Sequence, residues 1–524
     1  MIVSPQHRLV YYAPGEAPPE AVTAFPSAVQ PDGAIVLPMR LDYLRVARVM
    51  GMQVPPILDY DYDWPIKRGW KPTLAQRTMA SFMALNPRSF NLSEMRTGKT
   101  LSALWAADYL MTRSPTPIKA LVIAPLRTLE RTWRNTITEH FIGRRTCSVL
   151  HGVPKQRIGR LEQDVDFYLV NYDGLGIGFN RRGMTGFAAE LAKRQDIGIV
   201  IIDESTAYKT AGTQRHRAAT FLVGHRDVLW MMTGTPTPQG PIDAYGQARM
   251  MNNAGGYSLL GWRGRTMTQI TKFKWVPQPG SHEEVKKLLS PAVRFTQDEC
   301  FDAPDCVVMR EDAEMSAGQK KLYEEMRKRC TVEMQSAKVI SAVNEGVMRA
   351  KLIQIACGAL YDDNHDAHYV DATPRLSVLR EVIEAAPRKI IVFAPLTSVV
   401  HLLEKFVSQF ASCVVVNGEV GSREADERIK SFQQDTDIRV LIAHPGPIAR
   451  GLDLTTAATI IWYAPTDRTE DYIQANERIN GPAQTHKRTI VQISASAVER
   501  EIYRRLEANE SLQGAMLTLV NGKG

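Results

Sequence analysis

The chain has 524 residues, 44% of them hydrophobic and 23% charged, which is typical of a globular protein with about three domains and excludes a disordered or fibrous chain. Lysine and arginine outnumber aspartate and glutamate by 64 to 56, and the resulting charge of +8 favours a polyanionic partner. No secretion signal, no long apolar stretch and no closely spaced cysteine pair occurs, so we expect a reduced, cytoplasmic protein of a bacterial or phage-infected cell, with no membrane partner.

The first half of the chain predicts an accessory module followed by an α/β domain. Residues 1–68 are rich in proline and lack strong periodicity, which indicates a small N-terminal module. Over residues 69–245, short apolar segments alternate with helical patterns; the segments are 119–125, 166–172, 197–204 and 228–234. Such segments are typical of parallel strands buried on both faces, with ligands bound at their carboxyl ends.

The second half predicts a helical insertion and another α/β domain. Residues 246–370 contain a long helical pattern at 316–335 and a basic, loop-like stretch at 261–275. Residues 371–505 contain five apolar segments, at 388–395, 412–418, 438–444, 458–465 and 488–494, and residues 506–524 form a C-terminal tail. The predicted fold class is therefore α/β, with two parallel-sheet domains in tandem.

A phosphate-binding segment is predicted at residues 91–105, NLSEMRTGKTLSALW, where a strand should lead into a helix. Backbone N–H groups at a helix N-terminus can wrap phosphate oxygens. Lys99 would reach the β- and γ-phosphates of ATP, and the Thr100 hydroxyl would hold Mg²⁺. Since Ser93 replaces the glycine of the strict pattern, an ordinary helix start is the alternative. The candidate nucleotide-binding residues here are Arg96, Thr97, Gly98, Lys99 and Thr100.

Two further segments predict the rest of an ATP site. The apolar segment VIIDEST (200–206) ends in Asp203, which can bind Mg²⁺, and Glu204, which can deprotonate the attacking water. The segment MTGTP (232–236) carries Thr233 and Thr235, which are suited to hydrogen-bonding the carboxylate loop. Taken singly, the Asp203–Glu204 pair could be a solvated loop pair and the threonine segment could be a plain turn. The order of the three segments favours phosphoryl transfer.

This order of motifs resembles helicase superfamily two and is most similar to its Swi/Snf-like branch, including phage-encoded DEAD/DEAH-type members. The resemblance covers about residues 70–495. Six more segments support it: KPTLAQ (71–76), LVIAPLRTLERTW (121–133), VNYDGL (170–175), KIIVFAP (389–395), IARGLDL (448–454) and YIQANERINGPAQ (472–484). It implies two RecA-like domains that hydrolyse ATP and move on nucleic acid.

The resemblance also implies roles for individual residues. Gln76 would read adenine, Asp453 and Gln474 would lie at the nucleotide, Arg450 would approach phosphate, and Arg478 would cross the interdomain cleft to the γ-phosphate. Residues expected to hold the nucleic-acid backbone are Arg127, Arg131 and Asn171 in the first domain and Asn417 and Gly418 in the second. The chain departs from the family pattern at Gly481, where members usually have a second arginine, and at Arg96, where they usually have glycine.

The expected partner is DNA, held through its backbone with little sequence preference. The resemblance favours duplex or branched DNA, and RNA is the alternative because such loops can also contact 2′-hydroxyls. The basic and aromatic residues of the insertion either widen this surface or form a solvated face; they are Trp262, Arg263, Arg265, Lys272, Lys274 and Trp275. Three functions remain: an ATP-dependent DNA helicase or translocase, a nucleotide-gated DNA-binding factor with weak ATPase activity, or the motor subunit of a restriction or defence complex.

Overall fold

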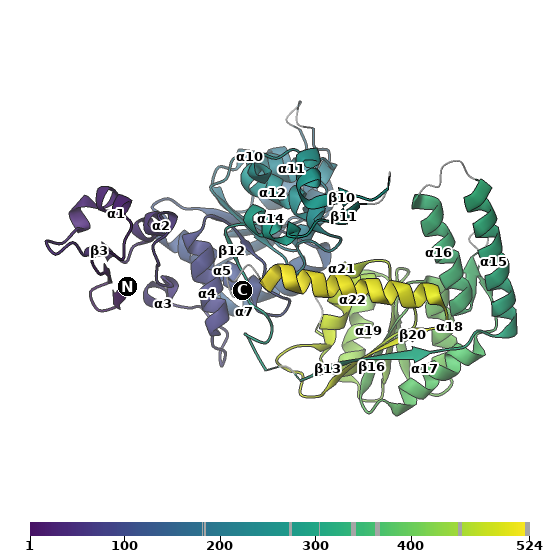
Figure 1. Ribbon diagram of the computed structural model, residues 1–524. Helices are drawn as coiled ribbons and strands as arrows, with labels where there is room; N and C mark the ends of the chain where they lie inside the picture. The colour runs from purple at the N-terminus through teal and green to yellow at the C-terminus, as the bar shows by residue number, and fades with distance from the viewer. Residues whose placement is uncertain are drawn as a thin grey trace. The chain divides into compact units, whose positions relative to one another are not determined.

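The computed structural model describes residues 1–518 apart from residues 181, 183–184, 272–274, 303, 337–341, 362–366 and 449–452. The chain forms two compact units, each with its own sheet. Unit 1 is built mainly from Met1–Thr268 and Val276–Cys300, and unit 2 mainly from Phe301–Gly514 (Figure 1).

Unit 1 is built around a seven-stranded sheet with the order β12-β4-β9-β8-β5-β7-β6, in which every neighbouring pair is parallel. The strands are β4 (Arg88–Asn91), β5 (Lys119–Ala124), β6 (Cys147–Val149), β7 (Phe167–Asn171), β8 (Ile197–Ile202), β9 (Val228–Met232) and β12 (Ala292–Val293). The four predicted strands are β5, β7, β8 and β9. Every residue of β7 and β9 is buried, as the apolar segments indicated.

Both faces of this sheet are covered. Ala120, Val122 and Ala124 of β5 lie in one hydrophobic cluster, while Leu121 and Ile123 lie in another, because strand side chains alternate between faces. The first cluster includes α4 (Leu74–Leu85) and α5 (Lys99–Arg113), and the second includes α10 (Phe187–Lys193), α11 (Gln214–Val223) and α12 (Ala244–Asn252). The strand ends are therefore the edges of the sheet at which a ligand can bind.

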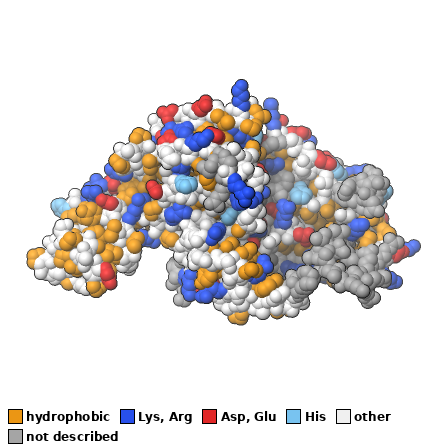
Figure 2. Space-filling model, turned by 90° about the horizontal axis from the view of Figure 1, so that it is seen from above, with side chains coloured by type: hydrophobic (Ala, Val, Ile, Leu, Met, Phe, Trp, Pro, Cys, Tyr) orange, Lys and Arg blue, Asp and Glu red, His pale blue; other side chains and the backbone are white. Residues whose placement is uncertain are grey.

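The N-terminal residues form an antiparallel sheet of β1 (Ile2–Ser4), β2 (Leu9–Tyr12) and β3 (Ile35–Pro38). Its core is continuous with that of α4 and α5. Trp64 packs edge-on against Trp105 of α5, with ring centroids 5.0 Å apart, and the Tyr62 hydroxyl donates to Asp108 Oδ2 at 2.6 Å. Figure 2 shows hydrophobic side chains gathered over this end of unit 1, where Ile2, Val22 and Val49 are exposed.

Unit 2 is built around a six-stranded sheet with the order β13-β20-β19-β16-β18-β17, again parallel at every pair. The strands are β13 (Cys306–Asp312), β16 (Lys389–Phe393), β17 (Cys413–Val416), β18 (Val440–Ala443), β19 (Ala457–Trp462) and β20 (Arg488–Ser494). Its helices include α17 (Thr373–Ala385), α18 (Thr397–Val407), α19 (Ser422–Gln434), α21 (Thr469–Asn476) and α22 (Ala497–Thr518). The five predicted strands are β16 to β20, and the fold class is confirmed.

Residues 246–370 contain the predicted long helix, α15 (Ala317–Ser336), which is followed by α16 (Ala342–Cys357). They are divided between the two units, because β12 pairs with β4 of unit 1 and β13 pairs with β20 of unit 2. The loop predicted at residues 261–275 was wrong, because α13 (Leu259–Thr266) and the paired strands β10 (Met267–Gln269) and β11 (Trp275–Pro277) lie there. Ser258 caps α13 by accepting from the Gly261 N–H, and buried Trp262 donates to the Pro241 carbonyl at 3.0 Å. Lys272 and Lys274 lie outside the described residues.

Among the residues that the structure describes, no helix is both long enough and hydrophobic enough to cross a bilayer.

Candidate functional site

The carboxyl ends of five adjacent strands of unit 1 carry its candidate residues. β4 leads into the phosphate loop (residues 92–98), β9 into residues 233–235, β8 into residues 203–204, β5 into residues 125–134 and β7 ends at Asn171. Because the order is β4-β9-β8-β5-β7, the threonine turn lies between the phosphate loop and the carboxylate pair. Segments far apart in the sequence thus meet along one sheet edge.

The phosphate loop enters α5 through left-handed backbone conformations. Arg96 has a φ of +62°, and Gly98, the N-cap of α5, has a φ of +88°. A Cβ at position 98 would lie 2.1 Å from Gln76 Nε2, so glycine allows the Gln76 amide to lie against the loop. Gln76 Oε1 accepts from the Thr73 N–H at 3.0 Å in the capping box that begins α4. Gln76 therefore lies beside the loop and also stabilises a helix terminus.

Lys99 folds back onto the phosphate loop. Its Nζ donates to the carbonyl oxygens of Ser93 and Glu94, both at 2.7 Å, and the residue is 9% exposed. Burial lowers the pKa of Lys99, while the carboxylates of Glu204 and Asp203 act in the opposite direction. Lys99 is therefore close enough to the carboxylate pair to feel its charge. Thr100, half-buried, follows in the first turn of α5.

Asp203 and Glu204 are held differently. Asp203 Oδ2 accepts from the Trp133 indole Nε1 at 3.0 Å, and Asp203 Oδ1 accepts from the Glu204 N–H at 3.0 Å. Burial, and then the charge of Glu204, raise the pKa of Asp203 to about 6. Glu204 has a φ of +45°, and its buried Oε2 has no hydrogen-bond partner among the described residues. The Oε2 atom is therefore an acceptor that is open to a further donor, while the positive φ is a conformation that residues with a side chain rarely adopt.

A hydroxyl chain joins the carboxylate loop to the threonine turn. The Thr206 hydroxyl donates to the Thr235 carbonyl at 2.8 Å and lies 2.8 Å from the Thr233 hydroxyl. Thr233 Oγ1 in turn accepts from the Thr235 N–H at 3.1 Å. The Thr233 N–H donates to the Asn91 carbonyl of β4 at 3.1 Å. These bonds link the loop after β8 to the strand that begins the phosphate loop.

A strap over the phosphate loop, residues 291–300, was not predicted. The Glu94 N–H donates to the Phe295 carbonyl at 2.9 Å, and the Phe295 N–H donates to Ser93 Oγ at 3.0 Å. Arg294, which is 3% exposed, donates to Glu94 Oε1 at 2.8 Å, and the Gln297 N–H donates to Glu94 Oε2 at 3.0 Å. These partners lie about 200 residues apart in sequence, and a two-residue strand has no periodicity, so no local pattern could predict them.

The residues expected to hold nucleic acid in unit 1 differ in exposure. Arg127 lies in α6 (Leu126–Thr128) and Arg131 in the π-helix η2 (Leu129–Arg134), and both are half-buried. Burial and the charge of Arg127 lower the pKa of Arg131. Asn171 is buried, with Arg157 Nη1 at 3.5 Å from its Oδ1. Lys and Arg side chains are spread over the face drawn in Figure 2, so charge alone does not mark a track there.

The nucleotide candidates of unit 2 lie in two neighbouring loops. The Leu454 N–H donates to the Arg478 carbonyl at 3.0 Å, which joins the segment of Asp453 to that of Arg478. Asp453 Oδ1 accepts from the Thr455 N–H at 3.0 Å. Arg478 Nε donates to the Gln474 carbonyl at 3.1 Å. The Gln474 side chain is fully buried and donates to Glu470 at 3.3 Å.

The remaining candidates of unit 2 lie at the end of the edge strand β17. Asn417 is buried; its Oδ1 accepts from the Glu419 N–H at 3.1 Å, and its Nδ2 donates to Glu419 Oε2 at 3.0 Å. Gly418, between these two residues, is exposed. Arg450 lies outside the described residues. The structure thus leaves Gly418 exposed at this strand end and turns Asn417 towards its own loop.

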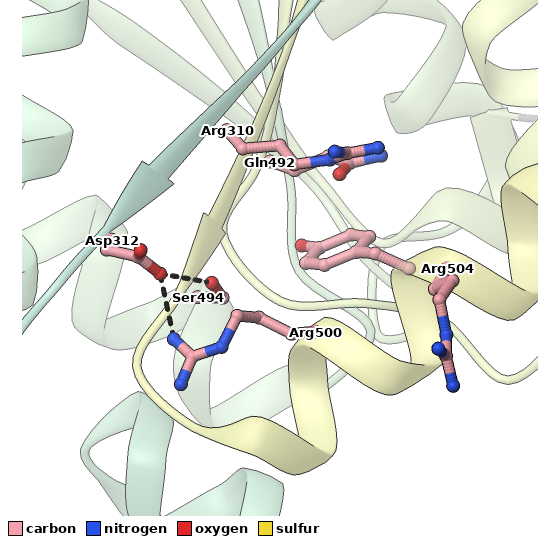
Figure 3. A pocket seen from close by; sticks show the side chains of 7 residues that line it. Arg310, Asp312, Gln492, Ser494, Arg500 and Arg504 are labelled. Carbon is pink, nitrogen blue, oxygen red and sulfur yellow. Dashed lines mark hydrogen bonds and ion pairs between the residues drawn. The ribbon is translucent and has the colours of Figure 1, made fainter.

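A separate pocket of about 340 Å³ lies between β13, β20 and the start of α22 (Figure 3). Its lining residues are Arg310, Asp312, Gln492, Ser494, Arg500, Tyr503 and Arg504. Arg500 pairs with Asp312 at 2.8 Å and Arg310 pairs with Glu507 at 2.6 Å. Because carboxylates neutralise these arginines, the pocket is not assigned to nucleotide or nucleic acid.

The two parallel-sheet units, with their ordered motifs, define a Swi/Snf-like helicase of superfamily two. Residues 92–357 match the SNF2-related domain and residues 374–480 match the helicase conserved C-terminal domain. The first match covers more than half of the chain, and the chain belongs to the SNF2-related family.

Similar proteins include a phage protein and a plant protein. Protein p41 of Acyrthosiphon pisum secondary endosymbiont phage 1 is 24% identical over 458 residues, which are 82% of this chain and 94% of p41. Protein CHROMATIN REMODELING 4 of Arabidopsis thaliana is 22% identical over 448 residues, 78% of this chain but 19% of the plant protein. The solved structure of the Sulfolobus solfataricus SWI2/SNF2 ATPase core in complex with dsDNA aligns with 87% of this chain and 96% of its own, at 18% identity and a TM-score of 0.40.

Proposed function

We propose that this protein is a DNA-dependent ATPase that couples ATP hydrolysis to translocation on DNA or to DNA remodelling. One arrangement supports this most: the phosphate loop with Lys99 follows β4, Asp203 and Glu204 follow β8 of the same parallel sheet, and the buried Glu204 Oε2 has no partner among the described residues. Membership of the SNF2-related family supports the ATP-hydrolysing part of the proposal. The plant relative is named for chromatin remodelling, which supports DNA as the track.

The phosphate loop is suited to a triphosphate. The N-terminus of α5, a helix of 15 residues, directs backbone N–H groups and a partial positive charge at the loop. We propose that Lys99 exchanges the carbonyls of Ser93 and Glu94 for the β- and γ-phosphates. Arg96, Thr97 and Gly98 belong to this loop, and Gln76, which lies beside Gly98, would contact the base.

The carboxylate pair is suited to Mg²⁺ and to the attacking water. We propose that the ion would be held by the Thr100 hydroxyl, the Asp203 carboxylate and phosphate oxygens, since Mg²⁺ binds oxygen ligands. The ion, when bound, neutralises charge on the phosphates. Glu204 would orient the water and accept its proton at Oε2.

Unit 2 would supply the response to ATP. We propose that Arg478 stabilises the charge on the transferred phosphoryl group, and that Asp453 and Gln474 support the loops around it. The Thr206 and Thr233 hydroxyls and the Thr235 backbone would report the state of the carboxylate loop. Backbone phosphates would be held by Arg127, Arg131 and Asn171 in unit 1 and by Asn417 and Gly418 in unit 2.

The test is ATP hydrolysis measured without nucleic acid and with duplex, forked and single-stranded DNA and with RNA. We expect the largest stimulation with duplex or forked DNA, and an activity that falls as salt rises. Lys99→Ala should abolish hydrolysis, whereas Lys155→Ala, which removes an exposed lysine of the same unit, should not. No stimulation by any nucleic acid, or full activity of Lys99→Ala, would refute the proposal. Triplex displacement and unwinding of forked DNA then separate translocation from strand separation.

A nucleotide-gated DNA-binding factor is the second candidate, and Gly481 favours it. Gly481 has a φ of +153°, a backbone conformation that residues with side chains rarely adopt, and it stands where the family resemblance implies a second arginine. Such a factor would change its DNA affinity with nucleotide but hydrolyse little ATP. Sustained multiple turnover on DNA would exclude it.

A further inference from the structure

Trp133 lies between two parts of the proposed machinery of unit 1. It belongs to η2, a π-helix of six residues that directly follows α6. π-Helical turns are rare and occur often at functional sites, because the wider turn redirects the side chains that follow. The Trp133 side chain is fully buried, in the same hydrophobic cluster as β5 and α5.

The Trp133 indole helps to orient the Asp203 carboxylate. Its Nε1 donates to Asp203 Oδ2 at 3.0 Å, whereas the donor to Oδ1, the Glu204 N–H, belongs to the next residue of the same loop. Of these two partners of the Asp203 carboxylate, Trp133 is therefore the one that belongs to a different element. A small shift of η2 would change the direction of the indole N–H and with it the orientation of Oδ2, since hydrogen bonds weaken steeply when misaligned.

The same short segment carries the arginines expected to hold a nucleic-acid backbone. Arg131 lies two residues before Trp133 within η2, and Arg127 lies in the preceding turn. The two guanidinium groups are near enough for Arg127 to lower the pKa of Arg131. A phosphate that binds between like charges relieves their repulsion, so its binding acts on the helix that holds Trp133.

We propose that Trp133 is a positioning residue that couples DNA contact at Arg127 and Arg131 to the orientation of Asp203. The inference rests on the proposed function and adds the route by which DNA would stimulate hydrolysis. Coupling between two binding sites is reciprocal. Nucleotide bound at Asp203 must therefore change the affinity for DNA by a certain factor, and DNA must change the affinity for nucleotide by the same factor. Under the proposal, both effects depend on the indole N–H of Trp133.

Trp133→Phe tests this, because it keeps an aromatic ring and removes the N–H donor; the cavity left by the smaller ring is matched in the control. Trp230→Phe is the matched control: Trp230 of β9 is also fully buried, and its Nε1 donates to the Asn86 carbonyl at 3.1 Å, away from the carboxylate pair. DNA affinity is measured by fluorescence anisotropy, with and without a non-hydrolysable ATP analogue and Mg²⁺. Thermal melting checks that both variants fold.

The intact protein and Trp230→Phe should show the same nucleotide-dependent change in DNA affinity, of about five-fold or more. Trp133→Phe should bind DNA alone as the intact protein does and lose most of that change, and its half-saturating Mg²⁺ concentration should rise. An unaltered nucleotide effect in Trp133→Phe, or an equal loss in Trp230→Phe, would overturn the inference. If the intact protein neither binds DNA nor is stimulated by it, the proposed function fails instead.

A second measurement needs no variant. Duplex DNA without nucleotide should change amide hydrogen exchange in peptides that cover residues 199–206, and peptides over Trp230 should stay unchanged. Unchanged exchange around Asp203 in the presence of saturating DNA would contradict the coupling, even if Trp133→Phe did not fold.

Discussion

The candidate residues of the two units are held in different ways. In unit 1, hydrogen bonds join loops from different strands: Thr206 bonds with Thr233, and Trp133 bonds with Asp203. In unit 2, the Arg478 Nε bonds with Gln474, four residues earlier, and the Asp453 side chain bonds with the backbone two residues later. Unit 1 therefore has a network that spans its sheet edge, while these side-chain bonds of unit 2 are local.

This difference favours a division of tasks. A network that crosses four strand ends fixes the geometry of the phosphate loop and carboxylates before ATP binds, which is what electrostatic preorganisation requires. In unit 2 the loops of Asp453 and Arg478 are joined through the backbone, and we propose that the Arg478 side chain responds to the γ-phosphate. Removal of Arg478 should then affect turnover alone, while removal of a unit 1 side chain that hydrogen-bonds another loop should also affect binding or stability.

Arg478→Ala should produce the largest effect. If Arg478 acts on the transferred phosphoryl group, its removal lowers kcat by about 10³- to 10⁵-fold, the range known for arginine fingers. Nucleotide affinity and the melting temperature should stay close to those of the intact protein. DNA-stimulated ATP hydrolysis and binding of a fluorescent nucleotide measure the two quantities.

The control for Arg478 is Arg468→Ala, an exposed arginine at the N-terminus of α21 that lies 3.8 Å from Asp471. It should leave kcat within about two-fold, since exposed ion pairs contribute little. A loss below ten-fold in Arg478→Ala would show that another group, such as Lys487 or Arg488, performs this task.

Glu204→Gln should lower kcat by about 10²- to 10⁴-fold, because the amide cannot accept the proton of the attacking water. The melting temperature should not fall, since the buried Glu204 Oε2 has no hydrogen-bond partner to lose among the described residues. Steady-state kinetics and calorimetry measure both. The exposed pair partner Glu190 gives the control variant Glu190→Gln, and a similar loss of kcat there would argue against a specific role for Glu204.

Arg294→Met tests the strap over the phosphate loop. It removes the bond to Glu94 Oε1 and should destabilise unit 1 by about 1–3 kcal/mol while raising KM for ATP. A double-mutant cycle with Glu94→Gln, read from urea unfolding, should show that the two changes are not additive. Additive effects, or an unchanged KM, would mean that the strap does not hold the loop. A rise in KM for ATP would indicate that the strap acts on the phosphate loop, because a general loss of stability does not by itself raise KM.

The features predicted from the sequence were those encoded locally. β7 and β9 are buried along their whole length, so unbroken apolar segments marked them. Asp203 and Thr233 directly follow strands, and Lys99 begins the helix that follows β4. Features that depend on distant partners were missed. Arg294 meets Glu94 from 200 residues away.

Two local features were also missed, for physical reasons. The glycines of α13 lower its helix propensity, so the sequence did not indicate this helix, which the burial of Trp262 stabilises. The sequence also placed Trp133 in the family motif without indicating the indole bond to Asp203, because a hydrogen bond between side chains of different elements leaves no spacing pattern. Asn171, Asn417 and Gln474 are likewise buried by packing, which a sequence motif does not indicate.

The smallest expected effect concerns Arg96, which has a left-handed φ of +62° in the phosphate loop. Arg96→Ala and Arg96→Gly both remove the guanidinium group and its interactions, but only glycine also removes the strain of a Cβ in this conformation. Arg96→Gly should therefore be more stable than Arg96→Ala by about 1 kcal/mol in urea unfolding. Equal stability of the two variants would mean that the loop relaxes without cost. The preorganisation attributed to unit 1 would then not extend to its phosphate loop, and the contrast with unit 2 would rest on the carboxylates alone.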